Sequence, residues 1–111
     1  MEGMYIQKFI ELVIGKVEYE NRLSVIKHNR KAKKLIEMYN ELEKNKEVAK
    51  KVYKELIKND NEEVKVIAAS HCLKLEIYIK ESEEILKECI SSSKNPILQG
   101  EADIVLQLYS K

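Results

Sequence analysis

The stretch "DNEEVKVIAASHCLKLEI", residues 60–77, has the clearest helical pattern in the chain. Its apolar residues recur at spacings of three and four, which places them along one side of an α-helix. Asn59, Asp60 and Asn61 favour turns and helix caps, so they predict where this helix begins. The predicted stripe consists of Val64, Ile67, Ala68, Cys72 and Leu75.

Length and composition favour one all-helical domain. The chain has 111 residues, enough for a single hydrophobic core. It contains only three Gly and one Pro, so it has few of the residues that a β-rich fold needs at its turns. Lys and Arg (20) nearly balance Asp and Glu (19), so no overall charge draws the chain to nucleic acid or to an anionic membrane. An electrostatic partner would have to bind a local patch.

The N-terminal pattern and the cysteines predict a cytoplasmic protein. Glu2, Lys8 and Glu11 interrupt the N-terminal apolar residues, which excludes a continuous signal-peptide core or membrane span there. Cys72 and Cys89 are too few for a secreted disulfide scaffold and do not form a C-x-x-C pair. We expect reduced thiols, and the bias toward Lys, Ile, Asn and Glu suggests a bacterial source.

The same periodicity predicts six helices along the chain. Ser82 is the expected N-cap of the fifth helix, because two glutamates follow it in what would be the first turn. Asn95 and Pro96 are the expected cap and first residue of the sixth helix. The apolar patterns cover residues 5–17, 23–42, 48–57, 64–75, 85–90 and 102–109.

The third and fourth predicted helices superpose on the fifth and sixth when the chain is shifted along itself so that Val52 lies on Ile85. This predicts a helical-hairpin repeat, with residues 46–78 as the first copy, 79–111 as the second, and 1–45 as a divergent hairpin or cap within one domain of residues 1–111. The paired positions are Val52/Ile85, Tyr53/Leu86, Leu56/Cys89, Ile57/Ile90, Val64/Ile97, Ala69/Ala102, Cys72/Val105, Leu73/Leu106 and Leu75/Leu108.

Residues 56–75, "LIKNDNEEVKVIAASHCLKL", resemble a HEAT-type repeat with its V-[RK]-x-x-A-A pattern. The matching residues are Val64, Lys65, Ala68 and Ala69. The chain also resembles a family of small bacterial HEAT-like proteins of uncharacterised function. The resemblance implies an all-α fold of six helices as three stacked antiparallel hairpins in a right-handed superhelix. It also implies a protein-binding role and supplies no catalytic residues.

The adjacent pair His71 and Cys72 has two interpretations. A catalytic cysteine needs a base within hydrogen-bond reach, but neighbouring residues on a helix point about 100° apart. Cys72 and Cys89 both lie on apolar stripes, which favours packing over redox or metal chemistry. No nucleophile with a base, glycine-rich phosphate loop or cluster of metal ligands is identified. We therefore expect no enzymatic activity, no cofactor and no metal.

A basic run, residues 22–34, is the strongest candidate for a charged contact. It contains four cations on one helical face, and no acid lies between Glu20 and Glu37. This basic face is either exposed to solvent without a partner or binds an acidic protein. Nucleic acid is a third alternative, but the balanced net charge of the chain favours it less. The candidate contacts, with two lysines of the fourth helix, are Lys27, Arg30, Lys31, Lys34, Lys65 and Lys74.

The sixth predicted helix is apolar on nearly all sides. Ile97, Ile104 and Leu108 form a second stripe beside the first. Helical solenoids usually end in a polar cap, so either the first hairpin or a second subunit should cover this stripe. A homodimer through the C-terminal helix is one of these alternatives.

The sequence therefore predicts a non-enzymatic protein-interaction module with an unknown protein partner. A bacterial immunity protein that neutralises a toxin is one form of this function. A HEAT-like nucleic-acid-binding protein that uses the basic run is the alternative.

Overall fold

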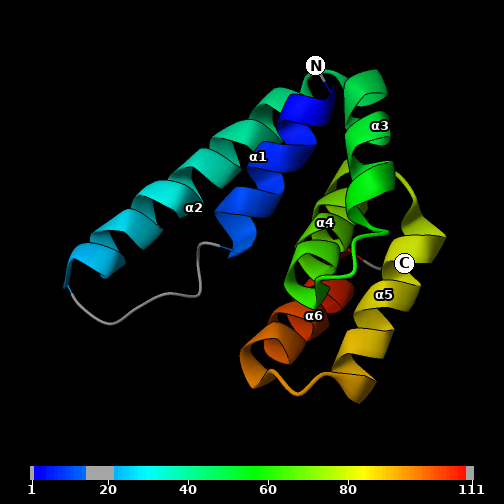
Figure 1. The fold of residues 1–111 in the computed structure, drawn as a ribbon. Helices are drawn as coiled ribbons and strands as arrows, with labels where there is room; N and C mark the ends of the chain where they lie inside the picture. The colour runs from blue at the N-terminus through cyan, green and yellow to red at the C-terminus, as the bar shows by residue number, and fades with distance from the viewer. Residues whose placement is uncertain (1, 15–21, 110–111) are drawn as a thin grey trace. The chain divides into compact units, whose positions relative to one another are not determined.

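The computed structural model describes residues 2–14 and 22–109, with the side chains of residues 3–14 and 33–109. These residues form helices and connecting turns without any strand, which confirms the predicted all-α class (Figure 1). None of the described helices is both long and apolar enough to cross a membrane. The helices are α1 (Glu2–Ile14), α2 (Arg22–Glu43), α3 (Lys46–Leu56), α4 (Glu62–Leu75), α5 (Ile79–Ser92) and α6 (Pro96–Tyr109).

The chain divides into two compact units, residues 1–52 and 53–111, and the division falls within α3. The sequence predicts a boundary between the first hairpin and the first repeat at residues 45 and 46. That position lies at the turn between α2 and α3, a few residues before the division between the two units. In the first unit α1 and α2 pack against each other as an antiparallel pair (Figure 1). Val17, the predicted end of the first helical stripe, lies outside the described residues. The buried residues of these two helices are Phe9, Leu12, Val13, Leu35, Met38 and Leu42.

The predicted N-cap of α4, the first complete helix of the second unit, is confirmed. The backbone N–H of Val64 donates to Oδ1 of Asn61 at 3.0 Å, which satisfies a donor that the helix itself leaves unpaired. Glu62 and Glu63 lie in the first turn, where negative charge is favourable against the helix dipole. Local sequence therefore sets the start of this helix.

The predicted start of α5 is wrong. Ser82 does not cap the helix, because α5 begins at Ile79 and its N-cap position is occupied by Tyr78. The reason is the tight turn after α4, in which Glu76 and Tyr78 both adopt left-handed backbone conformations with φ of 58° and 45°. This turn reverses the chain over a short distance, so the helix starts early and Ser82 is fully buried inside its first turns.

The predicted start of α6 is confirmed. Oδ1 of Asn95 accepts the backbone N–H groups of Ile97 at 3.1 Å and Leu98 at 3.2 Å, and Pro96 is the first helical residue. Asn61 and Asn95 thus play the same role, although the predicted repeat register would place Asn61 on the residue before Asn95. The chain from the start of α5 to the start of α6 is one residue longer than the chain from the start of α3 to the start of α4.

The extra residue changes which residues of α4 and α6 correspond. The first residues of α3 and α5 correspond in the predicted register. The first residue of α6 lies one position later than the residue that this register pairs with the first residue of α4. In this later register Val64 corresponds to Leu98 and Ala68 to Ala102, and all four are buried, as are both members of the predicted pair Ala69 and Ala102. The predicted pairing of Val64 with Ile97 is wrong by one residue, because the cap determines where the helix begins.

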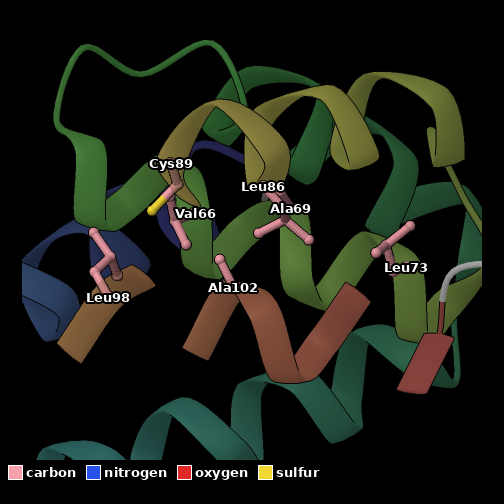
Figure 2. Packing of buried hydrophobic residues seen from close by; sticks show 7 residues of the cluster. All are labelled: Val66, Ala69, Leu73, Leu86, Cys89, Leu98 and Ala102. Carbon is pink, nitrogen blue, oxygen red and sulfur yellow. The ribbon is translucent and has the colours of Figure 1, made fainter. Parts of the chain in front are cut away.

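α4, α5 and α6 pack against one another and enclose the core of the second unit. Figure 2 shows residues of all three helices gathered between them. Two small residues, Ala69 of α4 and Ala102 of α6, are completely buried in this cluster. Small side chains at a helix contact permit close approach of the backbones. The cluster consists of Val66, Ala69, Leu73, Leu86, Cys89, Leu98 and Ala102.

Candidate interaction surface

One side of α6 belongs to the core and the other does not. Leu98 and Ala102 are buried against α4 and α5, and they anchor the helix. On the other side Ile97, Ile104 and Leu108 expose 76%, 57% and 69% of their surface. Spacings of seven and four place these three side chains along one line of the helix, which we call the α6 stripe. The predicted second stripe is therefore exposed within the described residues.

Gly100 lies beside the α6 stripe on the exposed side of α6. A Cβ atom added at this residue would meet nothing within 4 Å, so no packing inside the described structure requires a glycine here. Glycine in a helix costs roughly 1 kcal/mol relative to alanine. Because glycine has no side chain, the backbone of another helix can approach α6 closely at Gly100.

Comparison with α4 shows the role of this side of the helix in the predicted first repeat. Val66 and Leu73 of α4 pack against α5 and α6 in the core cluster. In the register set by the two asparagine caps, the corresponding residues of α6 are Gly100 and Gln107, which are exposed. The side of α6 that corresponds to the helix-packing side of α4 is thus open in this structure.

Acidic side chains flank the exposed side of α6, which carries the α6 stripe, Gly100 and Gln107. Glu101 and Asp103 are the charged residues of α6, and both are exposed. Glu101 lies next to the α6 stripe, whereas Gly100 and Gln107 lie between the stripe and Asp103. Gln107 donates from Nε2 to Oδ2 of Asp103 at 3.0 Å. An apolar line between two carboxylates favours a partner surface that is apolar in the middle and positively charged at its margins.

Lys74, one of the predicted contact residues, is already engaged within the second unit. Its Nζ atom lies 6.0 Å from the centre of the Tyr109 ring, in position for a cation–π interaction. Tyr109 itself is 43% exposed. The pair joins the last turn of α4 to the last turn of α6, so Lys74 acts in packing as well as in surface charge.

The other predicted lysines lie among acidic residues. Lys34 lines a surface hollow of the first unit together with Lys8 and two glutamates, Glu37 and Glu41. Lys65 is half-buried in a hollow between α4 and α5, and the acidic lining residues there are Asp60, Glu62 and Glu88. Neither hollow is a basic patch. The side chains of Lys27, Arg30 and Lys31 lie outside the described residues.

The cysteines behave as packing residues, as predicted. Cys72 and Cys89 are buried and free. Burial raises the pKa of the Cys72 thiol to about 12; the Ser82 hydroxyl lowers this pKa and Glu81 raises it. Burial, and then the charge of Glu62, raises the pKa of the Cys89 thiol. Because the thiolate is the reactive form, these thiols are poor nucleophiles at neutral pH.

His71 forms a specific contact with the end of α3. Its Nδ1 atom lies 2.8 Å from the Tyr53 hydroxyl oxygen, and the two rings meet edge to face with centroids 5.7 Å apart. Tyr53 is fully buried and His71 is half-buried. The geometry supports a structural role for His71. Among the described residues, no group of three or more His, Cys, Asp or Glu side chains could hold a metal ion.

Comparisons of the chain with protein-family models, with curated proteins and with solved structures find no match. The resemblance to HEAT-type repeats therefore stays a prediction. The α6 stripe was visible in the sequence as an apolar periodicity. Gly100, Glu101 and Asp103 were not singled out as contacts. Their spacing from Ile97 and Ile104 places Gly100 and Glu101 beside the stripe and Asp103 beyond Gly100.

Proposed function

We propose that the chain is a non-enzymatic protein-interaction module that binds its partner through the α6 stripe. The observation that carries this proposal is the exposure of Ile97, Ile104 and Leu108 on a helix whose opposite side is in the core. Contiguous apolar side chains on a surface helix often mark a site of protein association, because burying them removes apolar area from water.

The proposed fold for this function is a HEAT-like stack of the three hairpins. It is supported by the repeated pair of helices and by the asparagine caps at equivalent positions, Asn61 and Asn95. In such a stack, each hairpin packs against the next, and the last hairpin presents an open side. The α6 stripe belongs to the hairpin of α5 and α6, so we propose this hairpin as the binding surface.

Capture from a lysate of the source organism tests the function. The tagged chain, an Ile104→Ser variant and an Ile36→Ser variant are compared, because Ile36 is 61% exposed on α2 and Ile104 is 57% exposed. We expect a stoichiometric protein with the natural chain and with the Ile36 variant, and a strong loss with the Ile104 variant. A captured protein that is toxic when expressed alone would identify the immunity form of this function.

Two results would overturn the proposal. Capture that is equal for all three proteins would show that the α6 stripe does not bind the partner. Nucleic acid in the eluate that is released as the salt concentration rises would instead favour the nucleic-acid-binding alternative through the basic run of residues 22–34.

A further inference from the structure

The open side of α6 fits a helix. α6 contains 14 residues and is about 21 Å long, and the α6 stripe extends along most of it. The corresponding side of α4 packs against α5 and α6, which are themselves helices. Gly100 replaces the bulk that Val66 contributes at the corresponding position of α4, so a helix can approach the backbone of α6 at this residue.

The charges on α6 specify the partner further. Glu101 lies next to the α6 stripe, Asp103 lies on the far side of Gly100 and Gln107, and α6 carries no basic residue. Lys74 of α4 is placed against the end of α6, where it lies over the Tyr109 ring. Opposite charges at the margin of an apolar contact increase the association rate and the specificity, whereas like charges oppose docking.

These charges argue against a second copy as the occupant. The α6 stripe runs from Ile97 to Leu108, so its middle lies next to Glu101 and Asp103. In a symmetric dimer, the two-fold axis brings the residues at the middle of the contact against the same residues of the other copy. Such a dimer through α6 would place the four carboxylates together, without a basic residue of α6 between them.

We propose that the α6 stripe binds an amphipathic helix of another protein, one whose apolar face is bordered by Lys or Arg side chains. In the bound state the apolar face covers Ile97, Ile104 and Leu108. The basic side chains approach Glu101 on one border and Asp103 on the other. This inference rests on the proposed function and names the chemistry of the partner.

Synthetic peptides test the inference directly. The probes are three fluorescent amphipathic peptides of five helical turns: one with a leucine face bordered by lysines, one with the same face bordered by glutamates, and one with the lysine peptide's composition in scrambled order. Binding to the full chain is measured by fluorescence anisotropy at low and moderate salt. We expect the lysine-bordered peptide to bind at least about tenfold more tightly than the other two peptides.

Variants of the chain identify the surface that binds the peptide. Ile104→Ser should remove binding, whereas Ile36→Ser should leave it unchanged. The double variant Glu101→Lys with Asp103→Lys should reverse the preference toward the glutamate-bordered peptide. Gly100→Leu should weaken binding without loss of folding, because the added side chain has open space within the chain but obstructs an approaching helix. Thermal melts of each variant confirm that it is folded.

The outcomes separate this inference from the proposed function. Equal binding of the lysine and glutamate peptides, or a preference that charge reversal does not change, would overturn the inference. A dimer in analytical ultracentrifugation that Ile104→Ser dissociates would also overturn it in favour of a second copy. In either case capture of a protein that depends on Ile104 would still support the proposed function, whereas loss of that dependence would contradict the function itself.

Discussion

The hydroxyl oxygen of Tyr53 lies 2.8 Å from Nδ1 of His71, and this contact connects the end of α3 to the middle of α4. When Nε2 carries the proton of the neutral imidazole, the tyrosine hydroxyl donates to Nδ1. Tyr53 is fully buried, so this hydroxyl has no access to bulk water as a substitute partner. The pair gives the second unit a polar contact between α3 and α4.

Removing this contact should destabilise the chain. We expect Tyr53→Phe to lower the free energy of unfolding by about 1 kcal/mol, because the ring still fills its site but the imidazole loses its partner. Urea unfolding followed by circular dichroism measures the change. Tyr39→Phe is the matched control, since that hydroxyl makes a long, exposed contact of 3.4 Å with Glu43 and should matter less. Equal effects of the two substitutions would contradict the assigned role of Tyr53.

Ser82 offers the opposite case, a buried hydroxyl without a well-formed hydrogen bond among the described residues. The Cys72 thiol lies near it, but a thiol is a weak hydrogen-bond partner. The corresponding residue of α3 in the predicted first repeat is Ala49, which is also fully buried. We expect Ser82→Ala to raise the free energy of unfolding by roughly 1 kcal/mol, because a buried hydroxyl without a good partner is costly.

The matched control for Ser82→Ala is the other buried serine. Oγ of Ser70 donates to the backbone carbonyl of Val66 at 2.9 Å, so Ser70→Ala removes a satisfied hydroxyl. Ser70→Ala should leave the free energy of unfolding unchanged or lower it. Destabilisation by Ser82→Ala, measured in the same urea titrations, would show that the Ser82 hydroxyl has a partner that stabilises it.

The Cys72 thiol predicts a loss of stability at alkaline pH. Its pKa is raised from 9.0 to about 12 in the folded chain, first of all by burial. Below pH 9 the thiol is protonated in both the folded and the unfolded state, so its ionisation does not lower the free energy of unfolding. Between pH 9 and 12 only the unfolded state ionises, so stability should fall by about 1.4 kcal/mol for each pH unit.

A variant without the thiol isolates this contribution from those of the tyrosines and lysines. Cys72→Ala should be less stable at pH 7, because it leaves a small cavity, yet its stability should fall less steeply above pH 9. Unfolding free energies of both proteins are measured from pH 7 to pH 10.5. Parallel curves for the two proteins would mean that Cys72 ionises in the folded state as readily as in the unfolded state.

Gly100 predicts a stabilising substitution. It lies in the interior of α6, is exposed, and has open space at its Cβ position. Gly100→Ala should raise the free energy of unfolding by about 0.5 to 1 kcal/mol, because alanine loses less backbone entropy on folding. Thermal and urea unfolding measure the gain. Gly3→Ala, near the start of α1, should have a smaller effect because helix ends fray.

Ala69 predicts a destabilising substitution. It is fully buried in the cluster between α4, α5 and α6. Ala69→Leu should lower the free energy of unfolding by about 1 to 3 kcal/mol, because the added atoms force neighbouring side chains or helices apart. Ser91→Leu, at an exposed position of α5 outside the cluster, controls for the change in hydrophobicity. A melting temperature that is unchanged by Ala69→Leu would contradict the close packing of these helices.

Much of the fold could be predicted because its information is local. The apolar periodicity of residues 64–75 and the caps Asn61 and Asn95 require only a few neighbouring residues, and each is confirmed. The start of α5 could not be predicted in this way. Ser82 is a good cap by residue type, but the left-handed conformations of Glu76 and Tyr78 begin the helix before Ser82 is reached.

The candidate surface was predicted in part. The pattern indicated that Ile97, Ile104 and Leu108 form a line, and their spacing alone determines that result. Which positions of α4 correspond to that line depended on the cap of α6, because one added residue before a helix rotates its sides by about 100°. Lys65 lies in a hollow that Glu88 of α5 also lines, and no local pattern reveals this neighbour. Lys34 lies in a hollow with Glu37 and Glu41, whose spacings of three and seven along α2 are visible in the sequence.

The sequence by itself determined the helical class, most helix boundaries and the apolar line on the last helix, since these depend on side-chain periodicity and on caps that act within a single helical turn. Only the tertiary structure decided that Ser82 is buried, that Tyr53 meets His71, and that α6 presents the α6 stripe to solvent. Each of these depends on which helices approach one another, and that approach is determined by the length of the turns and by the summed packing of the core.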